Sequence, residues 1–140
     1  MLQPFSVTTE EIEIKPEGQE TPLKVTVVKT AGELNIEDCN TFHETFDSIL
    51  EPETPDESQT EEPKKIIVDL TECPHVVSRG FAQILVALAK TTTRGGDICV
   101  VGLQPGVKGA FRQIGMDDVV RDFQDIEDAR KNWNAFKQPR

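Results

Sequence analysis

The sequence predicts an α/β fold, because segments with the pattern of strands alternate along the chain with segments that have apolar residues at helical spacing. In addition, Gly and Pro residues fall between these segments, where turns are expected. The predicted order is β-β-α-β-α-β-α-(β)-α, in which the bracketed strand is short. With 140 residues the chain has the length of one domain, so we expect a single domain over residues 1–140.

Two strands and a helix open the chain. Residues 11–15 alternate polar residues and isoleucines, as a half-buried strand does, and residues 25–29 form a second strand pattern. The connection between them is short, which predicts antiparallel pairing. An amphipathic helix is predicted over about residues 37–50, with an apolar stripe made of Ile36, Cys39, Phe42, Phe46, Ile49 and Leu50.

A buried strand and a second helix follow. Residues 66–70 are nearly all apolar, which is typical of a strand covered by other elements. Apolar residues between Phe81 and Ala89 predict the helix, with Ser78 as its N-cap and Gly95-Gly96 at its end.

The last part of the chain is predicted to hold a strand over residues 98–101 and a helix that begins at Pro105 and ends at Gly115. Val119-Val120 is expected to form a short edge strand. Asp125 can cap a final helix, in which Glu127 and Lys131 have the i, i+4 spacing of an ion pair.

Residues 51–63 differ from the rest of the chain. They contain six acids and three prolines, with no aliphatic or aromatic residue. Such a segment cannot bury enough apolar surface to offset the entropy of ordering it, so we expect a flexible loop within the domain. An acidic docking segment is the alternative interpretation.

The net charge of −10 argues against binding to duplex nucleic acid or to an anionic membrane surface. The longest apolar run, Ile84 to Ala89, is far too short to cross a bilayer, and no secretory signal is visible. The cysteines Cys39, Cys73 and Cys99 are odd in number and widely spaced, which is typical of reduced thiols. We therefore expect a cytoplasmic protein.

Catalytic candidates are few. Cys73 and His75 stand two positions apart at the end of a strand and could form a thiol–imidazole pair, but such a pair needs a third, orienting group, and zinc usually takes four ligands. His43 is expected at the boundary of the first helix. We predict no enzymatic activity, no metal and no cofactor, and keep an enzyme that uses Cys73 and His75 as the alternative.

Gly102, Gly106 and Gly109 flank a strand-to-helix turn, but their spacing matches neither the phosphate-loop motif nor the dinucleotide-binding motif. Turn geometry and the start of a helix explain these glycines without a nucleotide.

Ser78 has two interpretations, because it stands between a buried strand and a helix. As an N-cap its hydroxyl would stabilise the helix by about 0.5–2 kcal/mol. As a phosphoacceptor it would receive about −1.5 to −2 charges at a helix start, where the backbone amides favour an anion.

Residues 65–81 resemble the central block of the STAS domain, which is shared by anti-sigma factor antagonists and the tails of sulfate transporters. Asp69-Leu70-Thr71 corresponds to its Asp-Leu-Ser, and Ser78-Arg79-Gly80-Phe81 to its Ser-Ser/Ala-Gly-Leu. Further blocks follow the same order at residues 32–35, 95–107 and 115–116. The resemblance spans about residues 25–123.

The resemblance implies a mixed sheet of four to five strands with about four helices, mainly on one face. It also implies a partner switch, in which the unphosphorylated protein binds an anti-sigma factor or serine kinase and the protein phosphorylated at Ser78 releases it. A phosphatase is the further partner that this resemblance suggests. Val77 and Asn35 stand where the family has aspartates. We expect the partner to contact Ser78 and residues of three strand-end loops: Glu33, Asn35, Val77, Arg79, Gly80, Gln104 and Gly106.

The resemblance leaves one further alternative open. The chain could be a STAS scaffold without a phosphoswitch, or the soluble STAS subunit of an ABC lipid-transport system.

Overall fold

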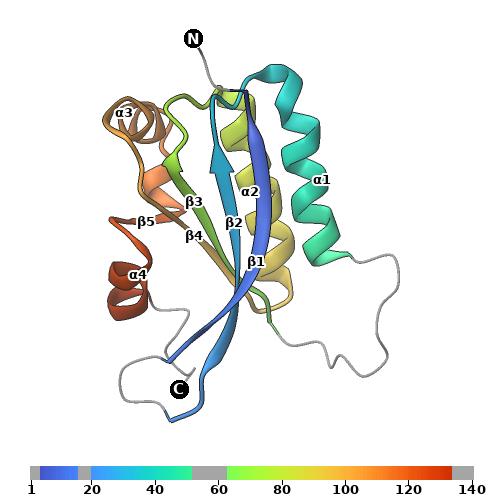
Figure 1. Cartoon of the computed structure of the whole chain (residues 1–140), viewed down its shortest axis with the longest axis vertical. Coiled ribbons are helices and arrows are strands. Elements are labelled where there is room, and N and C mark those ends of the chain that lie inside the picture. The colour runs from blue at the N-terminus through green and yellow to red at the C-terminus, as the bar shows by residue number, and fades with distance from the viewer. Residues whose placement is uncertain (1–3, 16–19, 52–62, 134–140) are drawn as a thin grey trace.

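The computed structural model describes residues 4–15, 20–51 and 63–133. Its sheet has five strands in the order β1-β2-β3-β4-β5 (Figure 1). Their bounds are Ser6–Ile14, Leu23–Ala31, Lys65–Glu72, Asp97–Val101 and Arg121–Phe123. β1 and β2 pair antiparallel, as their short connection predicts, and the other neighbours pair parallel.

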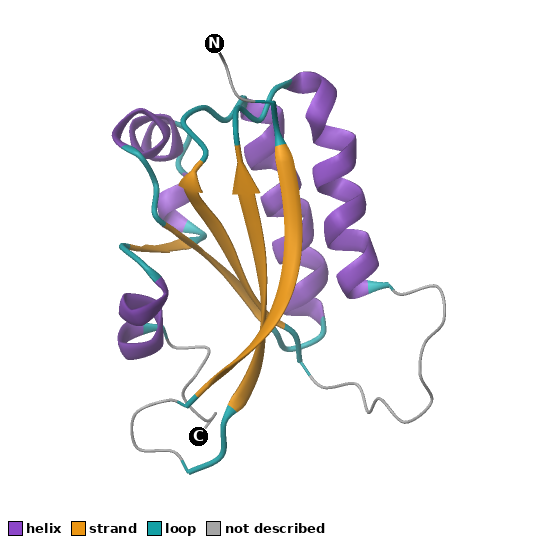
Figure 2. Ribbon diagram, in the orientation of Figure 1, coloured by secondary structure: helices purple, strands orange, loops and turns teal. Residues whose placement is uncertain are grey.

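Four α-helices accompany the sheet within the described ranges. They are α1 (Cys39–Leu50), α2 (Ser78–Thr93), α3 (Pro105–Gln113) and α4 (Ile126–Asn132). The short 3-10 turn η1 (Ile36–Asp38) leads into α1, and a second turn, η2 (Met116–Asp118), follows α3. The mixed α/β fold predicted from the sequence is confirmed (Figure 2).

Two apolar layers cover the two faces of the sheet, because successive residues of a strand point to opposite sides. On β3, Ile66 and Val68 belong to the layer formed with α1, α2 and α3, whereas Ile67 belongs to the layer formed with α4. Trp133, just after α4, closes the second layer, and its Nε1 donates to Asp97 Oδ2 at 2.9 Å. Three helices therefore lie on one face and one on the other.

Polar contacts join α1 to α2. His43 Nδ1 lies 2.9 Å from Gln83 Oε1, and its Nε2 lies 3.0 Å from Asp47 Oδ2. Lys90 of α2 forms an ion pair with Asp47 of α1, in which Nζ lies 3.0 Å from Oδ1. The His43 side chain is 38% exposed, at the boundary position expected for it.

Several local predictions hold. Pro105 is the first residue of α3, and Asp125 caps α4 through a hydrogen bond in which Asp128 N donates to Asp125 Oδ1 at 2.8 Å. α2 ends before Gly95, whose φ of 82° suits glycine at a helix end.

Other local predictions are wrong. Val119-Val120 is not a strand, because Val120 N donates to Met116 O in the η2 turn, and the edge strand β5 begins at Arg121. The ion pair of Glu127 is formed with Arg130, three residues later, and not with Lys131. Arg130 Nη2 lies 2.5 Å from Glu127 Oε1.

The start of α1 also differs. Ile36 does not belong to the buried stripe, because the chain turns through η1 before α1 begins and leaves this side chain 64% exposed.

Residues 52–62, which make up nearly all of the acidic segment predicted to be a loop, lie outside the described residues. None of the helices in the described ranges has the length and apolar character needed to span a bilayer.

Candidate functional site

Three loops meet at one edge of the sheet, because the parallel strands β2, β3 and β4 all end there. In Figure 1 the arrowheads of β2 and β3 lie at the top of the view, beside the first turns of α1 and α2. The loops comprise residues 32–35 after β2, residues 73–77 after β3 and residues 102–104 after β4. We call the surface formed by these loops, together with residues 36–38 and 78–79 that directly follow the first two of them, the loop edge.

Backbone hydrogen bonds join the first two loops. Gly32 N donates to Glu72 O at 3.0 Å, and Leu34 N donates to His75 O at 2.9 Å. Val77 N returns a bond to Leu34 O at 3.0 Å, which completes a parallel bridge between Leu34 and Val76. The residue before Ser78 is thus fixed to the loop after β2.

Ser78 is the first residue of α2, and it is exposed. The N-cap is Val77, in an extended conformation with φ −71° and ψ 156°, and α2 has no side-chain cap. The prediction that Ser78 caps the helix is therefore wrong. The bridge to Leu34 keeps the chain extended as far as Val77, and helical geometry begins at Ser78 itself, one residue earlier than an N-cap at Ser78 requires.

The first turn of α2 leaves donors at the surface. Gly80 N and Phe81 N both donate to Val77 O, at 2.8 and 3.3 Å. In the described part of the chain, the amides of Ser78 and Arg79 make no protein hydrogen bond. They are the groups that could stabilise an anion on the Ser78 hydroxyl.

Gly80 lies behind this surface rather than on it. It is buried, and a Cβ at this position would lie 2.8 Å from Leu34 Cδ2 and 3.0 Å from Val76 Cγ1. Its lack of a side chain allows α2 to pack on the Leu34–Val76 bridge. The expectation that a partner contacts Gly80 directly is corrected accordingly.

The third loop is fixed to the end of β3. Gln104 Nε2 donates to Thr71 O at 2.9 Å, and Thr71 Oγ1 donates to Asp69 Oδ1 at 2.6 Å. Gly102, with φ 72°, lies so close to Thr71 that no side chain would fit. Gly106, in the first turn of α3, is exposed. Thr71 was not among the residues predicted for the site, although its place after Asp69 is typical of a turn stabilised by a carboxylate.

The loop edge carries opposite charges in neighbouring places. Glu37 and Arg79 are exposed, and Glu33 and Asp38 are half-buried. Arg79 and Asp38 both act on the buried thiol of Cys39. Burial raises the pKa of this thiol, the Arg79 charge lowers it and the Asp38 charge raises it.

Cys73 and His75 do not form a catalytic pair. The Cys73 thiol is buried and donates to the backbone carbonyl of His75 at 3.3 Å, whereas the His75 side chain is exposed. Burial raises the pKa of the Cys73 thiol, which disfavours the reactive thiolate. Among the described residues, no three metal-ligating side chains are grouped.

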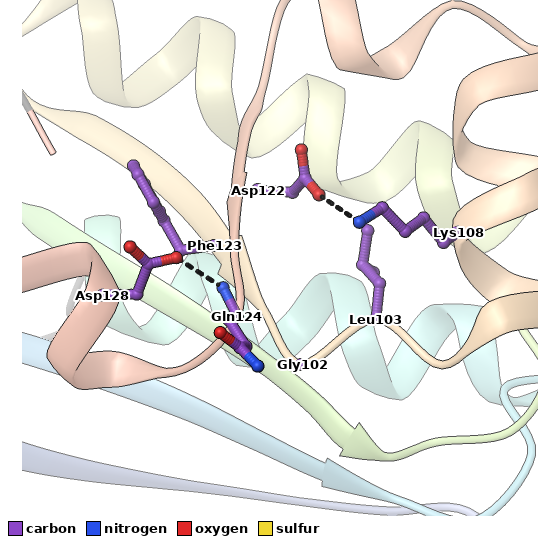
Figure 3. Close-up of a pocket in the computed structure, with 7 residues that line it drawn as sticks. All are labelled: Gly102, Leu103, Lys108, Asp122, Phe123, Gln124 and Asp128. Atoms are coloured by element: carbon purple, nitrogen blue, oxygen red, sulfur yellow. Dashed lines mark hydrogen bonds and ion pairs between the residues drawn. The ribbon is translucent and has the colours of Figure 1, made fainter. Parts of the chain in front are cut away.

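A hollow of about 360 Å³ lies beside the third loop, between α3, β5 and α4 (Figure 3). Its charged groups already have partners: Lys108 Nζ lies 3.8 Å from Asp122 Oδ2, and Gln124 N donates to Asp128 Oδ2 at 2.9 Å. We therefore assign the candidate site to the loop edge.

A mixed sheet whose strand-end loops surround an exposed serine defines a small α/β domain. The sequence model of the STAS domain matches residues 16–129. The chain belongs to the STAS domain family. No curated protein matches the chain in sequence.

Solved structures share the fold. An anti-sigma factor antagonist from Mycobacterium paratuberculosis is 16% identical, with a TM-score of 0.62 over 87% of this chain and 91% of that one. The antagonist SpoIIAA in its unphosphorylated form is 15% identical, with a TM-score of 0.60 over 86% and 91%. Its phosphorylated form, from Bacillus, is 13% identical, with a TM-score of 0.54 over 86% and 95%.

The murine anion transporter Slc26a9 is also similar, at 12% identity and a TM-score of 0.61. The match covers 89% of this chain but 22% of the transporter.

Proposed function

We propose that this protein is a cytoplasmic partner-switching regulator of the anti-sigma factor antagonist type. In this proposal the loop edge binds an anti-sigma factor with serine-kinase activity, and phosphorylation of Ser78 releases it. The observation that carries the proposal is the exposed Ser78 at the start of a 16-residue helix, beside two backbone amides that have no hydrogen-bond partner among the described residues.

The physical chemistry of the switch follows from this position. A phosphoryl group adds about −1.5 to −2 charges, which the helix start and the amides of Ser78 and Arg79 favour. The helix can therefore accept the modification. A kinase that phosphorylates Ser78 must hold the nucleotide phosphates opposite it, so the modified serine would face groups of its own sign. Like-charge contacts in an interface cost several kcal/mol, which is enough to disrupt a micromolar complex.

The structural neighbours support this proposal, since they include an antagonist in unphosphorylated and phosphorylated forms. The second candidate function is a STAS scaffold or transport subunit without a phosphoswitch. It is favoured by Val77 and Asn35, which stand in place of the family's acids, and by the likeness to a transporter domain.

Affinity and phosphorylation measurements separate the two candidates. Immobilised wild-type, Ser78→Ala and Ser78→Asp chains would be exposed to native lysate, and a retained kinase-type ATPase would be produced in pure form. Calorimetry should show that Ser78→Ala keeps the wild-type affinity, while Ser78→Asp loses about tenfold or more, roughly 1.4 kcal/mol. With ATP, the kinase should phosphorylate the wild type and leave Ser78→Ala unmodified.

The opposite result is equally clear. Equal affinities for all three chains, with no phosphorylation of the wild type, would overturn the switch in favour of a constitutive scaffold. Retention of transporter subunits in place of a kinase would support the second candidate.

A further inference from the structure

Ile36 is the most exposed large apolar residue of the described ranges, at 64%. It lies in the loop edge, one residue beyond the loop after β2. A single exposed isoleucine needs no explanation by itself. The surroundings of Ile36, however, give it the properties of an interface anchor.

The backbone on both sides of Ile36 is fixed. Before it, Leu34 is fully buried and hydrogen-bonded through both its amide and its carbonyl to the loop after β3. After it, Asp38 Oδ2 accepts from Asn35 N at 3.0 Å, and Asp38 N donates to Asn35 O at 3.0 Å. The buried Cys39 adds a bond from Sγ to Asn35 O at 3.4 Å. A partner would therefore meet a side chain whose backbone needs no further ordering, and this lowers the entropic cost of binding.

Ile36 and Ser78 belong to the same surface. The carbonyl of Leu34, two residues before Ile36, accepts the hydrogen bond from Val77, which directly precedes Ser78. On the other side, the charge of Arg79 reaches Cys39, three residues after Ile36. A protein that contacts Ser78 would thus also reach Ile36.

The charges divide this surface into two parts. Three acids, Glu33, Glu37 and Asp38, lie within three positions of Ile36, whereas Ser78 has the basic Arg79 beside it. A complementary partner would place basic side chains around Ile36 and an anionic group opposite Ser78 and Arg79. A kinase with bound nucleotide has such an anionic group in its phosphates.

We propose that Ile36 anchors the partner by entering an apolar pocket bordered by Lys or Arg side chains. This inference rests on the proposed function and names the chemistry of the partner surface. Interfaces are typically built around an aromatic or aliphatic anchor that fills a desolvated pocket inside a polar rim, and truncating such an anchor costs far more than truncating its neighbours.

The chain offers a matched control in Ile114, which follows the last residue of α3 and is 49% exposed. α3 begins at the loop edge, so Ile114 lies a helix length of about 13 Å from it. The binding of the kinase-type ATPase identified above would be measured by calorimetry for wild type, Ile36→Ala, Ile114→Ala and Glu37→Gln, at low and high NaCl. Melting temperatures of all four chains would be recorded.

We expect Ile36→Ala to lose about tenfold or more in affinity and Ile114→Ala to stay within about twofold of the wild type, with similar melting temperatures. Affinity should fall as NaCl rises, and Glu37→Gln should weaken binding at low NaCl only. If Ile36→Ala keeps the wild-type affinity while Ser78→Asp loses affinity, the role of Ile36 as an anchor is overturned and the proposed function stands. Affinity that is constant or rises with NaCl would overturn the basic border. Failure of the wild type to bind any kinase would overturn the proposed function and this inference with it.

Discussion

Gly80 of α2 packs directly on Leu34 of the loop after β2. A methyl group at Gly80 would lie 2.8 Å from Leu34 Cδ2, closer than real side-chain contacts allow. Because Leu34 and Val76 are bridged, this one contact sets how near the start of α2 comes to the loop edge. The position of Ser78 therefore depends on the absence of a side chain two residues further on.

Gly80→Ala should destabilise the protein by about 1–3 kcal/mol, because the added methyl overpacks a buried contact. The matched control is Gly109→Ala in α3, where a Cβ would meet nothing within 4 Å. Alanine is the better helix former, so this second change should stabilise by up to about 1 kcal/mol. Urea unfolding measures both. Effects of the same sign would contradict the packing described for Gly80.

The carboxyl group of Asp128 should titrate below the ordinary range of aspartate. Hydrogen bonds from Gln124 N and Asn132 Nδ2, at 2.9 and 2.7 Å, lower its pKa. A lowered pKa in the folded state contributes stability that is present above the unfolded value of about 3.9 and lost as the pH falls through the folded value. Carboxyl NMR titration of the wild type and Asn132→Ala checks this. The variant should titrate higher, and an unchanged value would remove Asn132 as a cause.

The three thiols should react slowly in the native protein. Cys39, Cys73 and Cys99 are buried, and burial raises the pKa of each. A raised pKa means that little thiolate is present at pH 8, and thiolate is the reactive form. A colorimetric thiol reagent should therefore label the native chain slowly and label all three cysteines at once in denaturant. One cysteine that reacts at the rate of a free thiol before unfolding would contradict this.

The sequence predicted the order of elements well because periodicity and capping residues act locally. Pro105 and Asp125 mark helix starts through their own chemistry, and the structure has them where expected. The errors occur where a tertiary contact overrides a local preference. Ser78 is not the N-cap because Val77, held extended by its hydrogen bond to Leu34, takes that position, and these two residues belong to loops that are far apart in sequence.

In the candidate site, too, the features set by local sequence could be predicted, and those set by tertiary contacts could not. The meeting of three strand-end loops at one edge follows from parallel strands, so it could be predicted. The exposure of Ile36 could not, because its spacing to Cys39 and Phe42 fits a buried stripe, and only the η1 turn rotates it outward. The burial of Gly80 likewise depends on side chains of another loop.

Val77 provides a test of how this loop edge differs from the family pattern. It occupies the N-cap of α2 in an extended conformation, which is the conformation that a capping side chain requires, yet valine offers no acceptor. An aspartate at this position would restore the family's acid and would accept a hydrogen bond from the first turn of the helix.

Because Val77 is half-buried, any replacement also removes apolar contact, so the informative comparison is between Val77→Asp and Val77→Ala. We expect the aspartate variant to be more stable than the alanine variant by about 0.5–2 kcal/mol near neutral pH, measured by urea unfolding. A carboxylate at a helix start is stabilised by the helix dipole, so this advantage should disappear as the pH falls below about 4 and the group is protonated. Equal stability of the two variants at pH 7 would show that a side-chain cap adds nothing at the start of α2.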